Sequence, residues 1–167
     1  MKTRFFYLIV LLVLASCGNE ASKIAYVQNF KLYAEFDLSK ELDADLQVFS
    51  DQRMRELDSL KIIFEQKTVD FQNMEEIPAE DYKAYNDLRN TLMFRQKSYE
   101  EDLIAKSQEY DQQIWERLNG YIAEYATEND YDFILGASGD GNLMFAKDTL
   151  DITDELIAYC NTNYSGK

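Results

Sequence analysis

A single long segment, residues 38–127, dominates this chain and holds only one glycine and one proline. Apolar residues recur along it at spacings of three and four, the pattern of an amphipathic helix. Two short apolar segments flank it, Lys23–Gln28 and Tyr131–Gly136, and their aromatic and β-branched residues are typical of strands. We therefore predict an α+β fold in which a helical hairpin projects from a small sheet-built body. Such a shape suits a protein that holds another molecule better than it suits a compact enzyme.

Pro78 divides the long segment into two helices that are predicted to pack antiparallel, with the tip near residues 75–80. It is the only proline in the chain, and it suits the first turn of a helix, where its missing N–H costs nothing. At 1.5 Å per residue, the first helix reaches about 55 Å, too far for a chain of this size to bury both of its faces. The hairpin arm, residues 38–127, must therefore project or pack against copies of itself.

The segments on either side of the arm, residues 23–36 and 128–164, are predicted to form the body. The Asp-Gly step at residue 140 favours a tight hairpin turn, so residues 143–146 are predicted to return as a strand. Asp151 is predicted to cap a final helix. Three short strands leave open edges and little core, which favours a sheet shared between subunits. The apolar residues expected to build this shared body are Ile24, Tyr26, Val27, Phe133, Ile134, Leu135, Met144 and Phe145.

Residues 1–16 have the features of an export signal. Two basic residues precede the apolar run Phe5–Leu14, which is shorter than the ~20 residues that span a bilayer. Small residues then lead into Cys17, as in a bacterial lipobox; an ordinary signal peptide with a chance cysteine is the alternative. We expect Cys17 to be lipidated and residues 17–22 to form a tether. Gly18 is not the aspartate that retains many lipoproteins in the inner membrane, so we expect a periplasmic protein anchored to the outer membrane.

The chain is strongly acidic, with 31 acidic and 17 basic residues and a net charge of −14. Removal of residues 1–16, which hold two basic residues and no acidic one, changes the net charge to −16. This charge argues against nucleic acid as a partner, because nucleic-acid binding depends on Lys and Arg replacing counterions. It argues equally against broad docking on anionic lipid. Basic or apolar partners are favoured instead.

No residue pattern points to catalysis, a metal or a cofactor. The chain has no histidine, which excludes His-based triads and the usual zinc sites. Adjacent carboxylates at residues 100–102 are typical of a solvated helix face, since neighbours on a helix do not face each other across a substrate. The run Gly139–Asn142 lacks the alternating ligands of a calcium loop and is interpreted as a turn. Cys160 is expected to be a small buried residue of the last helix, with a reactive thiol as the alternative.

Three segments, in their order and spacing, resemble the Skp/OmpH family of periplasmic chaperones: Lys23–Val27, Tyr131–Gly136 and Asp151–Ile157. The resemblance implies a homotrimer that shares a β-barrel body, with three helical hairpins around a cavity. It also implies an ATP-independent holdase that keeps unfolded outer-membrane proteins in that cavity. The best-known members are soluble and basic. Their lipopolysaccharide site and their attraction of acidic clients are therefore not carried over to this acidic, lipidated chain.

The distal part of the hairpin, on either side of Pro78, is rich in aromatic side chains and methionine. In a holdase these residues would line the cavity as adaptable apolar contacts, because methionine suits promiscuous surfaces. Alternatively, the aromatic rings pack in the seam between the two helices. The candidate client-contacting residues are Phe64, Phe71, Met74, Tyr82, Tyr85, Met93, Phe94 and Tyr99. The alternative function is a structural or adaptor lipoprotein that uses the same coiled-coil trimer to recruit one specific envelope partner.

Overall fold

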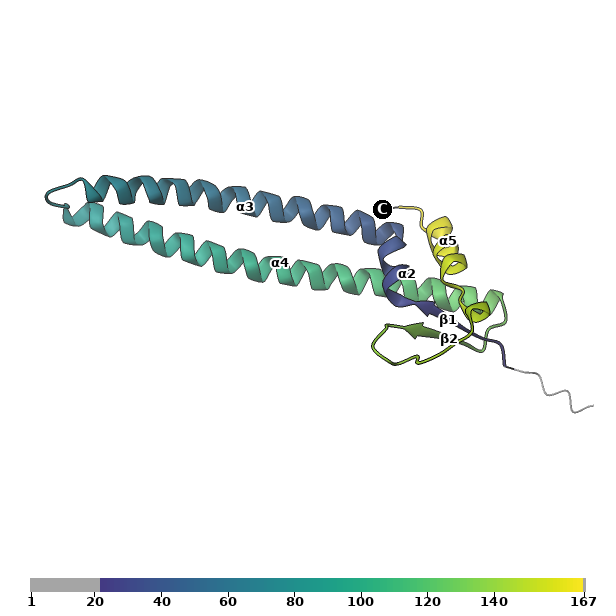
Figure 1. The fold of residues 1–167 in the computed structure, drawn as a ribbon. Helices are drawn as coiled ribbons and strands as arrows, with labels where there is room; N and C mark the ends of the chain where they lie inside the picture. Colours follow the sequence, from purple (N-terminus) through teal and green to yellow (C-terminus); the bar gives the residue numbers. More distant parts are fainter. Residues whose placement is uncertain (1–21, 167) are drawn as a thin grey trace, which may run out of the picture.

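The computed structural model describes residues 22–166, a mostly helical chain with a small two-stranded sheet. Two long helices, α3 (Asp37–Gln72) and α4 (Ala79–Glu128), run antiparallel and form the expected hairpin (Figure 1). The predicted signal peptide, the lipidation site Cys17 and most of the tether lie outside the described residues. The smaller elements, gathered at the open end of the hairpin, are β1 (Ile24–Gln28), α2 (Asn29–Glu35), β2 (Phe133–Ala137), the 3-10 helix η1 (Asp148–Leu150) and α5 (Thr153–Asn163).

Pro78 immediately precedes α4 and closes the tip of the hairpin. Its φ of −59° suits entry into a helix, and its carbonyl oxygen accepts a 3.0 Å hydrogen bond from the N–H of Tyr82. The carboxylates of Glu80 and Asp81 lie in the first turn of α4, where the helix dipole favours negative charge. The sharp reversal at the tip thus has a local cause in the sequence.

The two strands pair in parallel, with Ile24 opposite Phe133 at the start of the register. Parallel neighbours need a long crossover connection, and here the entire hairpin supplies it. A single bridge joins Tyr26 of β1 to Asp151 on the other side of the strand. Residues 22–166 therefore contain a sheet of only two strands, extended by one bridge.

Residues 29–35, for which the sequence predicts no element of their own, form helix α2. Leu32 and Phe36 are four residues apart, lie on the same side of the chain and are fully buried. The helical conformation places both apolar side chains in the core at once.

The strand predicted at residues 143–146 is absent, and the tight Asp-Gly hairpin does not form. Instead, the side chain of Asn142 folds back on the end of β2. Its Nδ2 donates to the carbonyl oxygen of Gly136 at 2.7 Å, and its Oδ1 accepts from the N–H of Ser138 at 3.2 Å. The carbonyl oxygen of Gly136 is thus bonded to a side chain rather than to a returning strand. Met144 and Phe145 consequently lie on an irregular loop.

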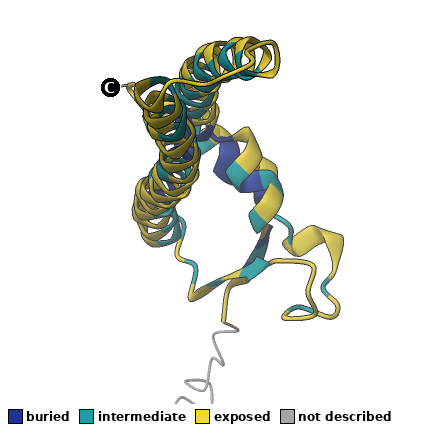
Figure 2. Ribbon diagram, turned by 90° about the vertical axis from the view of Figure 1, so that its left-hand side faces the viewer, coloured by how far each residue is buried: buried dark blue, intermediate teal, exposed yellow. Residues whose placement is uncertain are grey.

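The hydrophobic core lies where the open end of the hairpin meets α2 and α5. Buried residues gather there, while most of the hairpin is exposed along its length (Figure 2). Cys160 is fully buried, as predicted, and its burial raises the pKa of the thiol to about 11, which keeps the thiol protonated at neutral pH. The largest fully buried side chains in this core are those of Leu32, Phe36, Leu42, Ile114, Leu118 and Leu156.

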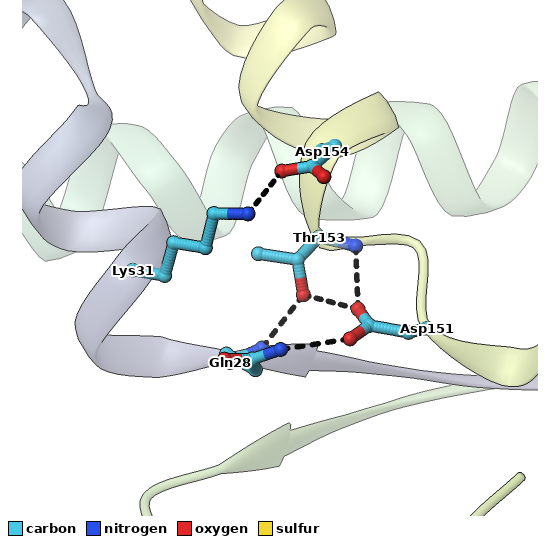
Figure 3. A network of polar contacts seen from close by, with 5 residues as sticks. All are labelled: Gln28, Lys31, Asp151, Thr153 and Asp154. Atoms are coloured by element: carbon cyan, nitrogen blue, oxygen red, sulfur yellow. Dashed lines mark hydrogen bonds and ion pairs between the residues drawn. The ribbon is translucent and has the colours of Figure 1, made fainter. Parts of the chain in front are cut away.

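Polar contacts hold the start of α5 against β1 (Figure 3). The carboxylate of Asp151 accepts hydrogen bonds from Gln28 Nε2 at 2.8 Å and from the N–H of Thr153 at 2.9 Å. Lys31 Nζ lies 2.5 Å from a carboxylate oxygen of Asp154. Burial opposes ionisation of Asp151, but hydrogen bonds from Thr153 and Gln28 outweigh it and lower its pKa. The prediction that Asp151 is the cap residue was wrong by one position, since the N-cap is Ile152, but the Asp151 carboxylate still accepts the hydrogen bond of the first N–H of α5, that of Thr153.

Candidate functional site on the helical arms

Three of the predicted contact residues form a cluster of rings between the two helices of the arm. The ring centroids of Phe64 and Tyr85 lie 4.9 Å apart, and those of Phe71 and Tyr85 lie 5.0 Å apart. Thr68 donates a 3.3 Å hydrogen bond to the hydroxyl of Tyr85. All three rings are half-buried, so they stabilise the distal seam rather than present a free surface.

Tyr99, another predicted contact residue, is buried at the middle of the hairpin. Its O–H donates to the carboxylate of Glu56, and this hydrogen bond lowers the pKa of Glu56. The guanidinium of Arg53 lies 4.8 Å from the centroid of the Tyr99 ring and 5.0 Å from that of Phe49, and it pairs with Glu56 at 3.5 Å. A cation between two rings thus fills the place where an apolar residue is missing from the seam.

The other four predicted contact residues, Met74, Tyr82, Met93 and Phe94, are exposed. Tyr82 and Met93 are 11 residues apart, and exposed Ile104 follows after another 11 residues. An 11-residue spacing returns to nearly the same helix face after three turns. Helix α4 therefore presents a row of exposed apolar side chains, Tyr82, Met93 and Ile104, outside the seam; we call it the α4 row.

Helix α3 carries further exposed apolar side chains that sequence reasoning missed. Val48, Ile62 and Val69 are separated by 14 and 7 residues, so they lie on one side of the helix, and Ile63 adjoins them. Met54 is exposed as well. The signal in the sequence is an apolar residue that falls outside the predicted seam on an otherwise charged helix. Both helices of the arm thus contribute to a packed seam and also carry apolar residues that remain in solvent.

A groove follows one side of the hairpin between α3 and α4. It consists of two cavities, of about 310 Å³ and about 680 Å³, whose walls share Ser50 and Leu103. Met54 contributes to the wall of the first cavity, and Ile104 of the α4 row contributes to the wall of the second. The groove therefore connects exposed apolar residues of both helices. We call it the arm groove.

Acidic groups predominate among the charges that border the arm groove. Glu100 and Asp58 border the first cavity, and Asp43 is the one charged residue in the wall of the second. Two cations also border the first cavity, but each lies beside a carboxylate. Lys61 is 3.9 Å from Asp58, and Arg53 is in the ion pair described above. The groove thus has walls that are partly apolar and a rim with more acidic than free basic groups.

The residues predicted to build a shared body are not all buried within this chain. Val27 is buried, while Tyr26 and Ile134 are half-buried. Phe133 and Leu135 are exposed on the same side of β2, because alternate residues of a strand face the same way. The predicted body residues left exposed are Ile24, Phe133, Leu135, Met144 and Phe145.

Residues 22–166 contain no group of three Cys, Asp or Glu side chains placed to hold a metal ion. None of the helices in this part of the chain combines the length and apolarity needed to cross a bilayer.

A long antiparallel helical hairpin on a small body with a two-stranded sheet defines a class of proteins that present an extended helical arm. The family within this class is identified by sequence: residues 23–159 match the model of the outer membrane protein (OmpH-like) family, and the chain belongs to that family. This match confirms the resemblance to the Skp/OmpH family that the three short segments indicate. No curated protein matches the chain.

One solved structure has the same fold along most of its length. It is a candidate outer membrane chaperone (OmpH-like) from Caulobacter crescentus CB15, 17% identical, with a TM-score of 0.63 and 87% of each chain covered. At this identity the likeness concerns the fold alone.

Proposed function

We propose that this protein is an ATP-independent holdase chaperone that binds unfolded outer-membrane proteins in the cell envelope. The observation that carries the proposal is the apolar surface of the arms, where the α4 row and Val48, Ile62 and Val69 of α3 remain in solvent. An amphipathic helix turns its apolar stripe toward the core, so apolar residues that recur along its outer face are available to a partner. Membership of the OmpH-like family supports the same role.

Many weak apolar contacts spread along an arm suit a client without fixed structure. Each contact contributes little, but contacts along one surface act together and raise the overall affinity. Methionines in the surface adapt to different side chains, which suits clients of varied sequence. Such binding requires no nucleotide and no catalytic residue.

The proposed holdase is a homotrimer with a shared β-barrel. In it, residues 23–36 and 128–164 form the trimerisation body, and residues 38–127 form the arms around a cavity. The exposed apolar residues on and beside β2 support this proposal, because a two-stranded sheet is marginal in water unless further strands or helices cover it. Burial of Phe133, Leu135, Met144 and Phe145 between subunits would provide that cover.

The proposed location is the periplasmic side of the outer membrane. After removal of residues 1–16, acylation of Cys17 would anchor the chain, and residues 17–22 would tether the body within a short distance of the bilayer. Several acyl chains on one terminus give a stable anchor, whereas one chain gives only marginal binding. The cavity would then lie next to the membrane into which its clients insert.

The test uses the chain from residue 17 onward, with Cys17→Ser so that it stays unlipidated. An unfolded outer-membrane β-barrel protein is diluted from urea with and without this chain, and its aggregation is followed by light scattering. The mass of the chain alone is measured by light scattering in the same buffer. We expect a trimer that keeps the client soluble at near-stoichiometric amounts.

A trimer that leaves the aggregation of the client unchanged would refute the holdase proposal and favour a structural or adaptor lipoprotein. A monomer that prevents aggregation would refute the trimer and retain the holdase. The two parts of the proposal are thus tested separately.

A further inference from the structure

The arm groove offers more than apolar area. Its walls combine apolar side chains with hydroxyl and amide groups, namely those of Gln47, Ser50, Ser107 and Gln108 in the larger cavity. An unfolded polypeptide presents a backbone N–H and C=O at every residue, and these groups need partners when they leave water. A groove with this mixture can take an extended segment of polypeptide, with side chains against its apolar wall and backbone groups against its polar one.

Charge decides which extended segments the arm groove favours. The hairpin, residues 37–128, contains 22 acidic and 11 basic residues, a net charge of −11. At the groove itself, the two cations lie beside carboxylates, and Asp43 and Glu100 add further negative charge at its rim. A field of this sign attracts basic segments and repels acidic ones.

We infer that the arm groove binds extended client segments in which apolar side chains alternate with lysine or arginine. In such a segment, one side faces the apolar wall formed by Met54, Leu103 and Ile104, and the basic side chains reach the carboxylates of Asp43 and Glu100. The inference rests on the proposed holdase function and adds to it a binding site and a class of client segment.

The test compares two short fluorescein-labelled peptides on the chain from residue 17 onward with Cys17→Ser. In one peptide leucine alternates with lysine, and in the other glutamate replaces each lysine. We expect the lysine peptide to bind at least about tenfold more tightly at low salt, because several exposed charge pairs act together. This preference should shrink as sodium chloride rises to about 1 M, where the screening length falls to ~3 Å.

Two matched pairs of variants locate the binding. Ile104→Ser removes an exposed apolar residue from the groove, whereas Phe30→Ser removes one on α2, outside the arm. We expect Ile104→Ser to weaken binding of the lysine peptide about fivefold through the apolar area lost, and Phe30→Ser to leave it unchanged.

The second pair changes the charge of the whole chain equally. Glu100→Lys alters the groove rim, and Asp102→Lys places the same change two residues further along, on another side of α4. We expect Glu100→Lys to weaken binding of the lysine peptide about threefold more than Asp102→Lys does. All four positions are exposed, and circular dichroism of each variant verifies that it folds like the parent.

Equal affinities for the two peptides, or equal effects within both pairs of variants, would overturn the inference. A fall in oligomer mass for Ile104→Ser, without a fall in peptide affinity, would also overturn it, since the groove would then belong to a contact between copies. Neither outcome affects the holdase proposal. That proposal is judged by aggregation of the unfolded β-barrel protein, measured with the parent chain and without peptide.

Discussion

The body and the distal arm of this protein obtain their stability in different ways. In the body, α2, α4 and α5 surround a common core, and residues such as Leu118 and Leu156 are completely removed from water. In the distal arm only one helix packs against one other, so most side chains in the seam stay partly exposed. The body can therefore serve as a rigid base, while the arm retains little stability of its own.

Polar contacts also differ between the two regions. The seam of the arm relies on pairs of tyrosine and carboxylate, Tyr99 with Glu56 and Tyr110 with Asp45. Such pairs fix the alignment of the two helices without adding much apolar burial. This molecule therefore concentrates its hydrophobic core in the body and leaves apolar residues in solvent along the arm.

The largest expected effect comes from Leu156→Ala in the body. The side chain is fully buried, so the variant loses apolar burial and leaves a cavity, at a cost of about 2–5 kcal/mol in the free energy of unfolding. Leu60→Ala in the seam of α3, where the side chain is only half-buried, should cost about half as much. Urea denaturation followed by circular dichroism, at one fixed chain concentration, measures both. Equal losses would show that the arm has a core comparable to that of the body.

Asp151→Asn should have the next largest effect, about 1–2 kcal/mol, because the carboxylate accepts the hydrogen bonds of Gln28 and Thr153. The pKa of Asp151 is lower in the folded protein than its ordinary value. Its ionised form therefore stabilises the fold above pH ~4, and this contribution is lost as the pH falls through the lowered pKa. The parent should lose stability in acid more steeply than Asp151→Asn.

The matched control for this change is Asp154→Asn. Its carboxylate pairs with Lys31 on the surface, and exposed pairs contribute only about 0–1 kcal/mol. Thermal unfolding at neutral and acidic pH compares the three proteins. If Asp154→Asn changes the acid sensitivity of the fold as much as Asp151→Asn does, the loss of stability in acid does not come from Asp151.

A smaller and local effect is expected for Tyr85→Ala at the distal ring cluster. Loss of the ring contacts with Phe64 and Phe71 should lower the free energy of local opening near the tip by about 1 kcal/mol. Hydrogen exchange should quicken in the distal halves of α3 and α4 and stay unchanged in α5. Tyr82→Ala, at an exposed position nearby, is the control and should leave exchange unaltered. Faster exchange in α5 as well would mean that arm and body unfold together.

Much of the fold could be predicted because its strongest signals are local. The seam of the hairpin follows from apolar spacing, and the tip follows from Pro78. The parallel pairing of β1 and β2 depends on contacts between residues more than a hundred positions apart, which no local pattern contains. Helix α2 is not evident in the sequence because distant residues bury Leu32. The strand predicted after β2 was wrong because a side-chain amide, that of Asn142, bonds to the end of β2 in its place.

The candidate site was less predictable than the fold. Aromatic composition indicated the distal arm, but it did not separate rings in the seam, such as Phe64, from side chains in solvent, such as Met93. Tyr99 is buried because its hydroxyl reaches Glu56, 43 residues away in the sequence. The arm groove depends on how two helices lie against each other. Spacing along one helix shows which residues share a face but not whether the neighbouring helix covers that face.

The smallest effect on stability, and the sharpest test of the contrast between body and arm, is expected for Met93→Ser in the α4 row. The side chain is exposed, so the free energy of unfolding should change by less than about 0.5 kcal/mol. Suppression of client aggregation should nevertheless weaken, because an apolar contact available to the client is lost, whereas Met93→Leu keeps the apolar area and should behave like the parent. Light scattering of a client diluted from urea measures the activity, and urea denaturation measures the stability. If Met93→Ser instead lost stability and kept full activity, Met93 would belong to the packed structure of the arm, and the surface that holds clients would have to lie elsewhere.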